Sequence, residues 1–240
     1  MKARPMRRKL TVRRDLYNLL NYTIERLLLQ DCLWGAAAFD ISCVRGYTVS
    51  KEHGRGKQSM AHTEKKLGSE LIYQGRIITV TQDTVELENG KQALREMVHH
   101  HGGAAIVPVD ENGDVYLVRQ FRYPMGQELL EIPAGKLEPG EDPFTAAVRE
   151  LEEECGLRAE HFEDLHPIYP TVGYDTEVIH LYLAAGLKRT QAHPDEDEFL
   201  DLVKYPLEEL VTMILDGTIR DAKTAAGLLK VWVMRQRGEA

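Results

Sequence analysis

The chain has 240 residues, of which 43% are apolar and 28% are charged, and this composition excludes a disordered or fibrous protein. Its net charge of −8 at pH 7 argues against nucleic acid as the main partner, because surfaces that bind the phosphate backbone are usually basic. Three cysteines, Cys32, Cys43 and Cys155, are too few and too scattered for a disulfide framework or a four-ligand zinc site, so a reducing compartment is expected.

The charge is unevenly distributed along the chain. Residues 1–59 hold twelve Lys and Arg against five Asp and Glu, a net charge of +7, which leaves −15 for the remainder. No run of residues approaches the roughly 20 apolar residues of a membrane span, and no clean signal-peptide core precedes a small-residue cleavage site. We therefore expect a protein with no membrane partner.

Residues 1–59 allow three interpretations. Apolar residues at helical spacing in LYNLLNYTIERLLL favour a basic helical arm. The basic start MKARPMRRKLTVRR also suits a transit peptide. We favour a third interpretation, in which Met60 is the true start, because residues 54–57 (GRGK) can be encoded by purine-rich codons that resemble a ribosome-binding sequence. Residues 60–240 are then expected to form one domain.

The first regular pattern after Met60 is extended. Residues 76–87 are rich in β-branched side chains, Asn89-Gly90 is typical of a hairpin turn, and residues 92–99 resume the pattern, which predicts an N-terminal β-hairpin or meander. A loop-like stretch, ELLEIPAGKLEPGEDP, comes later in the chain. Further strands are predicted over residues 104–109, 114–121, 176–185 and 199–205.

The segment after the loop-like stretch has the signals of a helix. Asp142-Pro143 is a typical helix start and Gly156 a typical end. The predicted helix has one apolar stripe, made of Phe144, Ala147, Val148, Leu151 and Cys155. Its glutamates Glu150, Glu153 and Glu154 lie away from this stripe, although like charges at such spacing repel by roughly 0.2 to 0.5 kcal/mol per pair.

Two closing helices are predicted over residues 207–216 and 221–236. Strands, one helix, further strands and terminal helices follow one another in this chain. That order indicates an α+β fold with mixed sheets rather than a regular alternation of strand and helix.

The sequence from Gly135 resembles the Nudix box, G-x5-E-x7-R-E-U-x-E-E-x-G-U, in which U is a bulky aliphatic residue. The resemblance implies an α/β/α sandwich, a divalent metal ion and hydrolysis of a nucleoside diphosphate linked to another group. The matching positions are Gly135, Glu141, Arg149, Glu150, Leu151, Glu153, Glu154, Gly156 and Leu157.

Pyrophosphate hydrolysis needs a hard cation, and Mg²⁺ or Mn²⁺ prefers oxygen ligands such as carboxylates. The resemblance implies that Glu150 and Glu154 bind the metal directly and that Glu153 binds the metal or holds water. It also implies a ligand in the carbonyl of Ala134. We expect Glu153 and Glu154 to be catalytic, whereas the alternative for an acidic helix is a solvated surface.

Four further stretches, REMVHHHGG, VRQFRYP, ELLEIPAGK and IRDAKTAAGLL, resemble the ADP-ribose pyrophosphatase branch of this family, over about residues 68–232. This resemblance implies conversion of ADP-ribose and water to AMP and ribose 5-phosphate in the cytoplasm. It also implies a homodimer that exchanges N-terminal strands and shares the active site between its subunits.

The same branch supplies expectations for individual residues. The resemblance implies that Arg122 contacts a phosphate, for which the paired donors of an arginine are suited. It also implies that Arg95 reaches the adenosine end and that Glu131 faces the ribose side. The stretch PDEDEF resembles a mobile acidic loop, which makes Glu196 the candidate base or water-orienting residue and Glu198 a further metal ligand. A solvated acidic loop is the alternative.

One stretch departs from the branch. Val172, in PTVGY, stands where an SPGF-like sequence usually carries proline. Another nucleoside diphosphate sugar, such as GDP-mannose, is therefore an open alternative substrate. A noncatalytic module that senses ADP-ribose is a second alternative, against which the complete set of box carboxylates argues.

Overall fold

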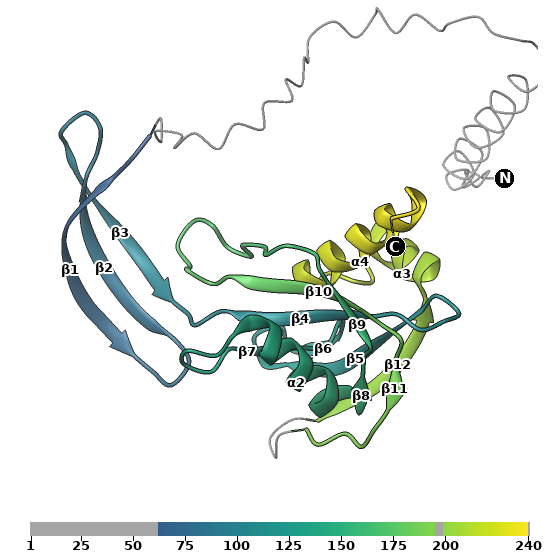
Figure 1. Cartoon of the computed structure of the whole chain (residues 1–240). Coiled ribbons are helices and arrows are strands. Elements are labelled where there is room, and N and C mark those ends of the chain that lie inside the picture. The colour runs from purple at the N-terminus through teal and green to yellow at the C-terminus, as the bar shows by residue number, and fades with distance from the viewer. Residues whose placement is uncertain (1–61, 195–198, 240) are drawn as a thin grey trace, which may run out of the picture. The chain divides into compact units, whose positions relative to one another are not determined.

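A computed structural model describes residues 62–194 and 199–239 (Figure 1). The expectations that residues 1–59 form a basic extension and that Met60 is the true start lie outside the described residues. Among the described residues, no helix has both the length and the apolar character needed to cross a membrane.

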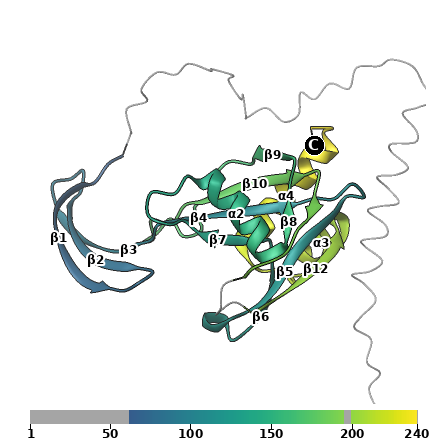
Figure 2. The same ribbon diagram turned by 60° about the horizontal axis from the view of Figure 1, so that its bottom comes forward.

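The N-terminal part is a three-stranded antiparallel sheet that stands apart from the other sheets (Figures 1 and 2). The predicted hairpin is confirmed: Gly90 has the positive φ of 75° that its turn requires, and its N–H donates to the carbonyl of Leu87. The first strand was not predicted, and every residue in it is exposed. The strands are β1 (Lys65–Gln74), β2 (Thr79–Glu86) and β3 (Gln92–His99).

The rest of the described chain forms a mixed sheet, an antiparallel sheet and a short strand pair. In the mixed sheet, order β7-β4-β10-β9, only β4 and β10 are parallel. Its strands are β4 (Gly103–Pro108), β7 (Ala134–Lys136), β9 (His161–Asp164) and β10 (Ile179–Ala185). The antiparallel sheet, order β12-β5-β6, contains β5 (Asp114–Arg122), β6 (Gln127–Glu131) and β12 (Leu200–Pro206). The strand pair is β8 (Leu157–Arg158) with β11 (Lys188–Arg189), and a 3-10 turn, η1, spans Tyr123–Met125.

Strand β4 is covered on both faces. Ala105 and Val107 belong to the core with the C-terminal helices, whereas Ala104 and Ile106 belong to the core with the helix of the box. This alternation follows from the two-residue period of a strand. The α+β class and the α/β/α layering predicted from the sequence are thus confirmed (Figure 2). The helices are α2 (Pro143–Cys155), α3 (Leu207–Leu215) and α4 (Ala222–Gln236).

The start of α4 is fastened to the segment between β6 and β7. Thr224 is fully buried, and its hydroxyl accepts a 2.9 Å hydrogen bond from the backbone N–H of Ile132 while donating to the carboxylate of Asp221. Asp221 also caps the helix by accepting the N–H of Thr224. One hydroxyl therefore satisfies the buried N–H of Ile132 and the half-buried carboxylate of Asp221.

Replacement of Thr224 by valine keeps the shape of the side chain and removes the hydroxyl. We expect Thr224→Val to lower the free energy of unfolding by about 1–3 kcal/mol, because the Ile132 N–H is left buried without its partner. Thr212→Val is the matched control, since Thr212 is exposed on α3 and donates only to a carbonyl of its own helix. Equal stabilities of the two variants in urea unfolding would contradict this account.

Candidate active site

The box helix α2 begins and ends where the sequence predicted. Asp142 accepts a hydrogen bond from the Thr145 N–H, Pro143 is the first helical residue, and Gly156 ends the helix with a left-handed φ of 58°. The buried stripe differs in part from the prediction, because Phe144 is 45% exposed and packs edge-on against the rings of Phe162 and Tyr182. The buried apolar positions of α2 are Ala146, Ala147, Leu151 and Cys155.

Two of the glutamates are buried rather than displayed on a wet surface. Glu150 lies against Gly135, where an added Cβ would come 1.7 Å from a carboxylate oxygen and would displace that carboxylate. Glu154 is 3% exposed and accepts a 2.9 Å hydrogen bond from the Ala134 N–H. The structure thus brings Ala134, Glu150 and Glu154 together at the contact between β7 and α2.

Arg149 holds three carboxylates at once. Its Nε and Nη2 donate to the two oxygens of Glu141, at 3.0 and 3.1 Å. Its Nη1 donates to Glu150 at 2.7 Å and to Glu153 at 2.8 Å. The Glu141 hydrogen bond raises the pKa of Arg149, and the same hydrogen bond lowers the pKa of Glu141. Arg149 therefore offsets the repulsion that the spacing of the glutamates creates.

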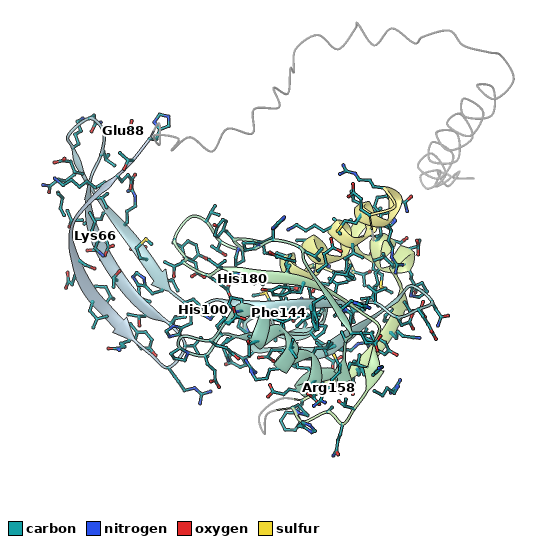
Figure 3. The ribbon with its side chains drawn as sticks, in the orientation of Figure 1. Lys66, Glu88, His100, Phe144, Arg158 and His180 are labelled. Atoms are coloured by element: carbon teal, nitrogen blue, oxygen red, sulfur yellow. The ribbon has the colours of Figure 1, made fainter. Side chains whose placement is uncertain are left out.

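The remaining box glutamate, Glu152, faces another side of the helix. It accepts hydrogen bonds from Arg158, with donor–acceptor distances of 2.9 Å. Arg158 lies at the C-terminal end of α2, away from His100 at the entrance to β4 (Figure 3). Glu152 is thus separated from Glu150, Glu153 and Glu154.

A second charged cluster lies across from the box. The Arg122 guanidinium donates to both oxygens of Glu131, at 2.7 and 2.8 Å, and Lys223 donates to Glu131 as well. Lys223 also lies 3.1 Å from the carboxylate of Asp221. Burial favours a higher pKa for Glu131, but the hydrogen bond from Arg122 and the charge of Lys223 outweigh it, so this pKa is lowered.

The two groups of charges line one cleft. Glu150, Glu153 and Glu154 line it from α2, and Arg122 and Lys223 line it from β5 and α4. The cleft therefore offers both carboxylates and cations. A molecule that carries phosphates next to a divalent cation requires this pair of surfaces.

Glu177 and His100 also line the cleft. A distance of 3.5 Å separates His100 Nδ1 from a carboxylate oxygen of Glu177. Burial raises the pKa of Glu177, and the nearby His100 opposes that shift. These residues, with Lys223 and Asp221, were missed as site residues. The only sequence signal for Lys223 and Asp221 was the IRDAKT stretch, to which no role was assigned.

Four predicted site residues are not among those that line the cleft in the described chain: Arg95, Glu131, Glu196 and Glu198. Arg95 lies on β3, where it forms an ion pair with Glu64 at 2.5 Å, and it does not line the cleft. Glu131 is 1% exposed and lies beneath the cleft wall, so its contact with the sugar stays a prediction. Glu196 and Glu198 lie outside the described residues.

The donor atoms around Gly135 suit a hard divalent cation, since they are carboxylate oxygens. Within residues 62–194 and 199–239, however, no three His, Cys, Asp or Glu side chains converge as metal ligands. In this structure Glu150 and Glu153 instead accept hydrogen bonds from one nitrogen of Arg149. Metal binding would require these carboxylates to exchange the guanidinium for the cation.

Cys155, the residue after Glu154, does not place a sulfur ligand beside the carboxylate oxygens. Its side chain is buried at the end of the α2 stripe. Burial, reinforced by the charge of Glu154, raises the pKa of the thiol far above its ordinary value.

The ion pair between Glu141 and Arg149 makes stability depend on pH. The pKa of Glu141 is lowered in the folded chain, so the pair contributes stability above the unfolded pKa of about 4.3 and loses it as the pH falls through the lowered value. We expect Glu141→Gln to lower the free energy of unfolding by about 1 kcal/mol at neutral pH in metal-free buffer.

The difference between Glu141→Gln and the wild type should shrink at about pH 3, below the unfolded pKa. Denaturant unfolding at neutral pH and at about pH 3 measures this difference in the free energy of unfolding. Glu163→Gln, at an exposed position of β9, serves as the control and should match the wild type at both. A constant Glu141→Gln deficit across the pH range would count against the ion pair as its cause.

Comparisons with known proteins agree with this geometry. Residues 99–228 match the NUDIX domain, and residues 64–98 match the nucleoside diphosphate sugar hydrolase N-terminal domain. A methanol dehydrogenase activator from Bacillus methanolicus is 43% identical over 67% of this chain and 88% of its own length. An ADP-ribose pyrophosphatase from Bacillus subtilis is 39% identical over 68% of this chain and 89% of its own length.

Among solved structures, the fold is similar to that of an ADP compounds hydrolase, with a TM-score of 0.66 and 23% identity over 76% of this chain and all of that one. The box glutamates on α2, the match to the NUDIX domain over more than half of the chain and the match of residues 64–98 lead to one conclusion. The chain belongs to the Nudix hydrolase family, and within it to the hydrolases of nucleoside diphosphate sugars.

Proposed function

We propose that this protein is an ADP-ribose pyrophosphatase, which hydrolyses ADP-ribose to AMP and ribose 5-phosphate. The observation that carries the proposal is the cleft itself, which is lined by the carboxylates of α2 together with Arg122 and Lys223. The relative from Bacillus subtilis, named an ADP-ribose pyrophosphatase, supports ADP-ribose as the substrate.

The residues that would hold a divalent cation are Glu150, Glu153 and Glu154, the carbonyl of Ala134, and Glu198. Mg²⁺ or Mn²⁺, when bound, neutralises phosphate oxygens and lowers the pKa of a water molecule. Gly135 allows the box loop to approach the carboxylate of Glu150 closely. Arg149 keeps the carboxylates on one side of the helix until the cation binds.

On the opposite wall, the guanidinium of Arg122 would bind a phosphate oxygen, for which its fork of donors is suited. Glu196 would act as the base or orient the attacking water. Arg95 would reach the adenosine end from the second subunit of a dimer, because in one chain it lies outside the cleft.

GDP-mannose is the alternative substrate. Val172, at the position where the ADP-ribose branch usually carries proline, is 83% exposed and therefore not fixed by packing in a single chain. A change in this loop alters the groups available to the sugar. A noncatalytic sensing module is the second alternative, and it does not account for the carboxylates that Arg149 gathers.

A panel of nucleoside diphosphate sugars with Mg²⁺ tests the proposal, with AMP as the product expected from ADP-ribose. We expect Glu153→Gln and Glu154→Gln to lower kcat by about a hundredfold or more, because each removes a carboxylate that acts in the reaction. Glu152→Gln is the matched control on the same helix and should retain kcat within about threefold, since Glu152 binds Arg158 on another side of the helix and does not line the cleft.

The outcomes of the panel separate the alternatives. Rapid cleavage of GDP-mannose without release of AMP from ADP-ribose would replace the proposed substrate. No cleavage of any member, together with binding of ADP-ribose, would favour the sensing module.

We further propose that the protein is a homodimer in which N-terminal strands are exchanged. Strand β1 exposes several large apolar side chains in a single chain, and such a surface marks an interaction site. A partner subunit would cover this strand and bring Arg95 to the cleft. The exposed apolar residues of β1 are Leu67, Leu71, Ile72 and Tyr73.

Light scattering of the purified protein should give twice the mass of one chain. Leu71→Glu should produce monomers and lower ADP-ribose turnover, because it places a charge on the surface that the partner covers. Leu215→Glu is the control, since Leu215 is 76% exposed on α3 and should leave the dimer intact. A monomeric wild type with full activity would refute the shared site.

A further inference from the structure

Glu131 lies in a cluster of two cations and two carboxylates. Its side chain is 2% exposed, and it accepts hydrogen bonds from two cations that come from different elements, Arg122 of β5 and Lys223 of α4. Asp221, at the start of α4, accepts a hydrogen bond from Lys223. Among the described residues, no hydrogen bond joins Asp221 to Arg122. The pair of cations therefore converges on one carboxylate.

The two cations differ in their access to the cleft. The Lys223 side chain is 11% exposed, and it is held between Glu131 and Asp221. Asp221 is itself fixed by Thr224, whose hydroxyl binds the backbone beside Glu131. The Arg122 side chain is 39% exposed, and it lies close enough to Glu154 of the box to feel its charge. Lys223 is thus the inner cation and Arg122 the outer one.

Arg122 has two competing partners once a diphosphate enters the cleft. A guanidinium that turns to a phosphate gives up its paired hydrogen bonds to Glu131. If Arg122 were the only cation, this movement would leave a buried carboxylate without compensation, and that cost would oppose binding. A second, inner cation removes most of that cost.

We propose that Lys223 is a positioning residue, which compensates the charge of Glu131 so that Arg122 can leave that carboxylate and bind a phosphate oxygen of the substrate. This inference rests on the proposed function only in requiring a diphosphate ligand. It gives the start of α4 a role in binding, although Lys223 itself forms no bond to the substrate.

The test measures binding of α,β-methylene-ADP with Mg²⁺ by calorimetry, since this probe carries a diphosphate that is not hydrolysed and no sugar beyond it. Lys223→Met should weaken binding by about tenfold or more, and Lys223→Arg should stay within about threefold of the wild type. With the substrate that the panel identifies, Lys223→Met should raise KM by a similar factor and change kcat by less than about threefold.

A double-mutant cycle with Glu131→Gln identifies the cause. Glutamine has no charge to compensate, so Lys223→Met should weaken binding by less than about threefold in the Glu131→Gln background. If the loss is as large in that background as in the wild type, Lys223 contacts the ligand directly and the inference is wrong. Unchanged binding by Lys223→Met in the wild-type background would also overturn it.

Lys230→Met controls for a merely structural effect. Lys230 is on the same helix, and its ammonium group donates to the carbonyl oxygens of Leu165 and His166, away from the cleft. Both methionine variants are expected to lose stability, but only Lys223→Met should lose affinity. Loss of affinity in both would assign the effect to the placement of α4. If the panel identifies a nucleotide sugar with another base, the α,β-methylene diphosphate of that nucleoside replaces the probe, so a failure of the ADP-ribose proposal and a failure of this inference are distinguishable.

Discussion

The hydrogen bond between the Ala134 N–H and Glu154 joins the two elements on which the site depends. It fastens β7, a strand of three residues, to a helix whose other face is packed in the core. A buried carboxylate needs such a partner, and a backbone amide provides one that only a proline at this position would remove. The contact keeps the Ala134 backbone beside Glu154, while pairing with β4 holds β7 itself.

The acidic face of α2 is the second feature on which the site depends. Glutamates three and four residues apart repel, and the chain places a single arginine among them instead of solvent or several separate cations. Arg149 belongs to the same turn as Glu150 and Glu153, so the compensation is local. Glu141 ties that arginine to the loop before the helix. The carboxylates are thereby gathered before any cation arrives.

The parts of the fold that depend on local signals could be predicted from the sequence. Asp142-Pro143 and Gly156 mark the ends of α2 because capping depends on residues only a few positions apart. Strand β6 was taken for loop because its apolar residues lie between a glycine turn and Pro133. Strand β1 was missed because none of its side chains is buried in one chain, so no core-facing pattern marked it.

The charged cluster around Glu131 shows why the rest could not be predicted. Residues 122, 131 and 223 come from three elements, and nothing in the spacing of the chain indicates that they meet. Glu131 resembled a residue open to the sugar, but its environment depends on how β6 packs beneath α4. Resemblance to a family could predict which residue type stands at a site. The partners that determine the charge of that residue could be identified only from the tertiary structure.

The burial of Cys155 has a consequence for which ions the cleft can select. Thiolates bind soft metals and react with oxidants, and a cysteine next to Glu154 would offer both kinds of chemistry if it ionised. Its raised pKa keeps the thiol protonated, and its place in the apolar stripe turns it from the carboxylates. The helix therefore presents carboxylate oxygens to the cleft, which the thiol of Cys155 does not line.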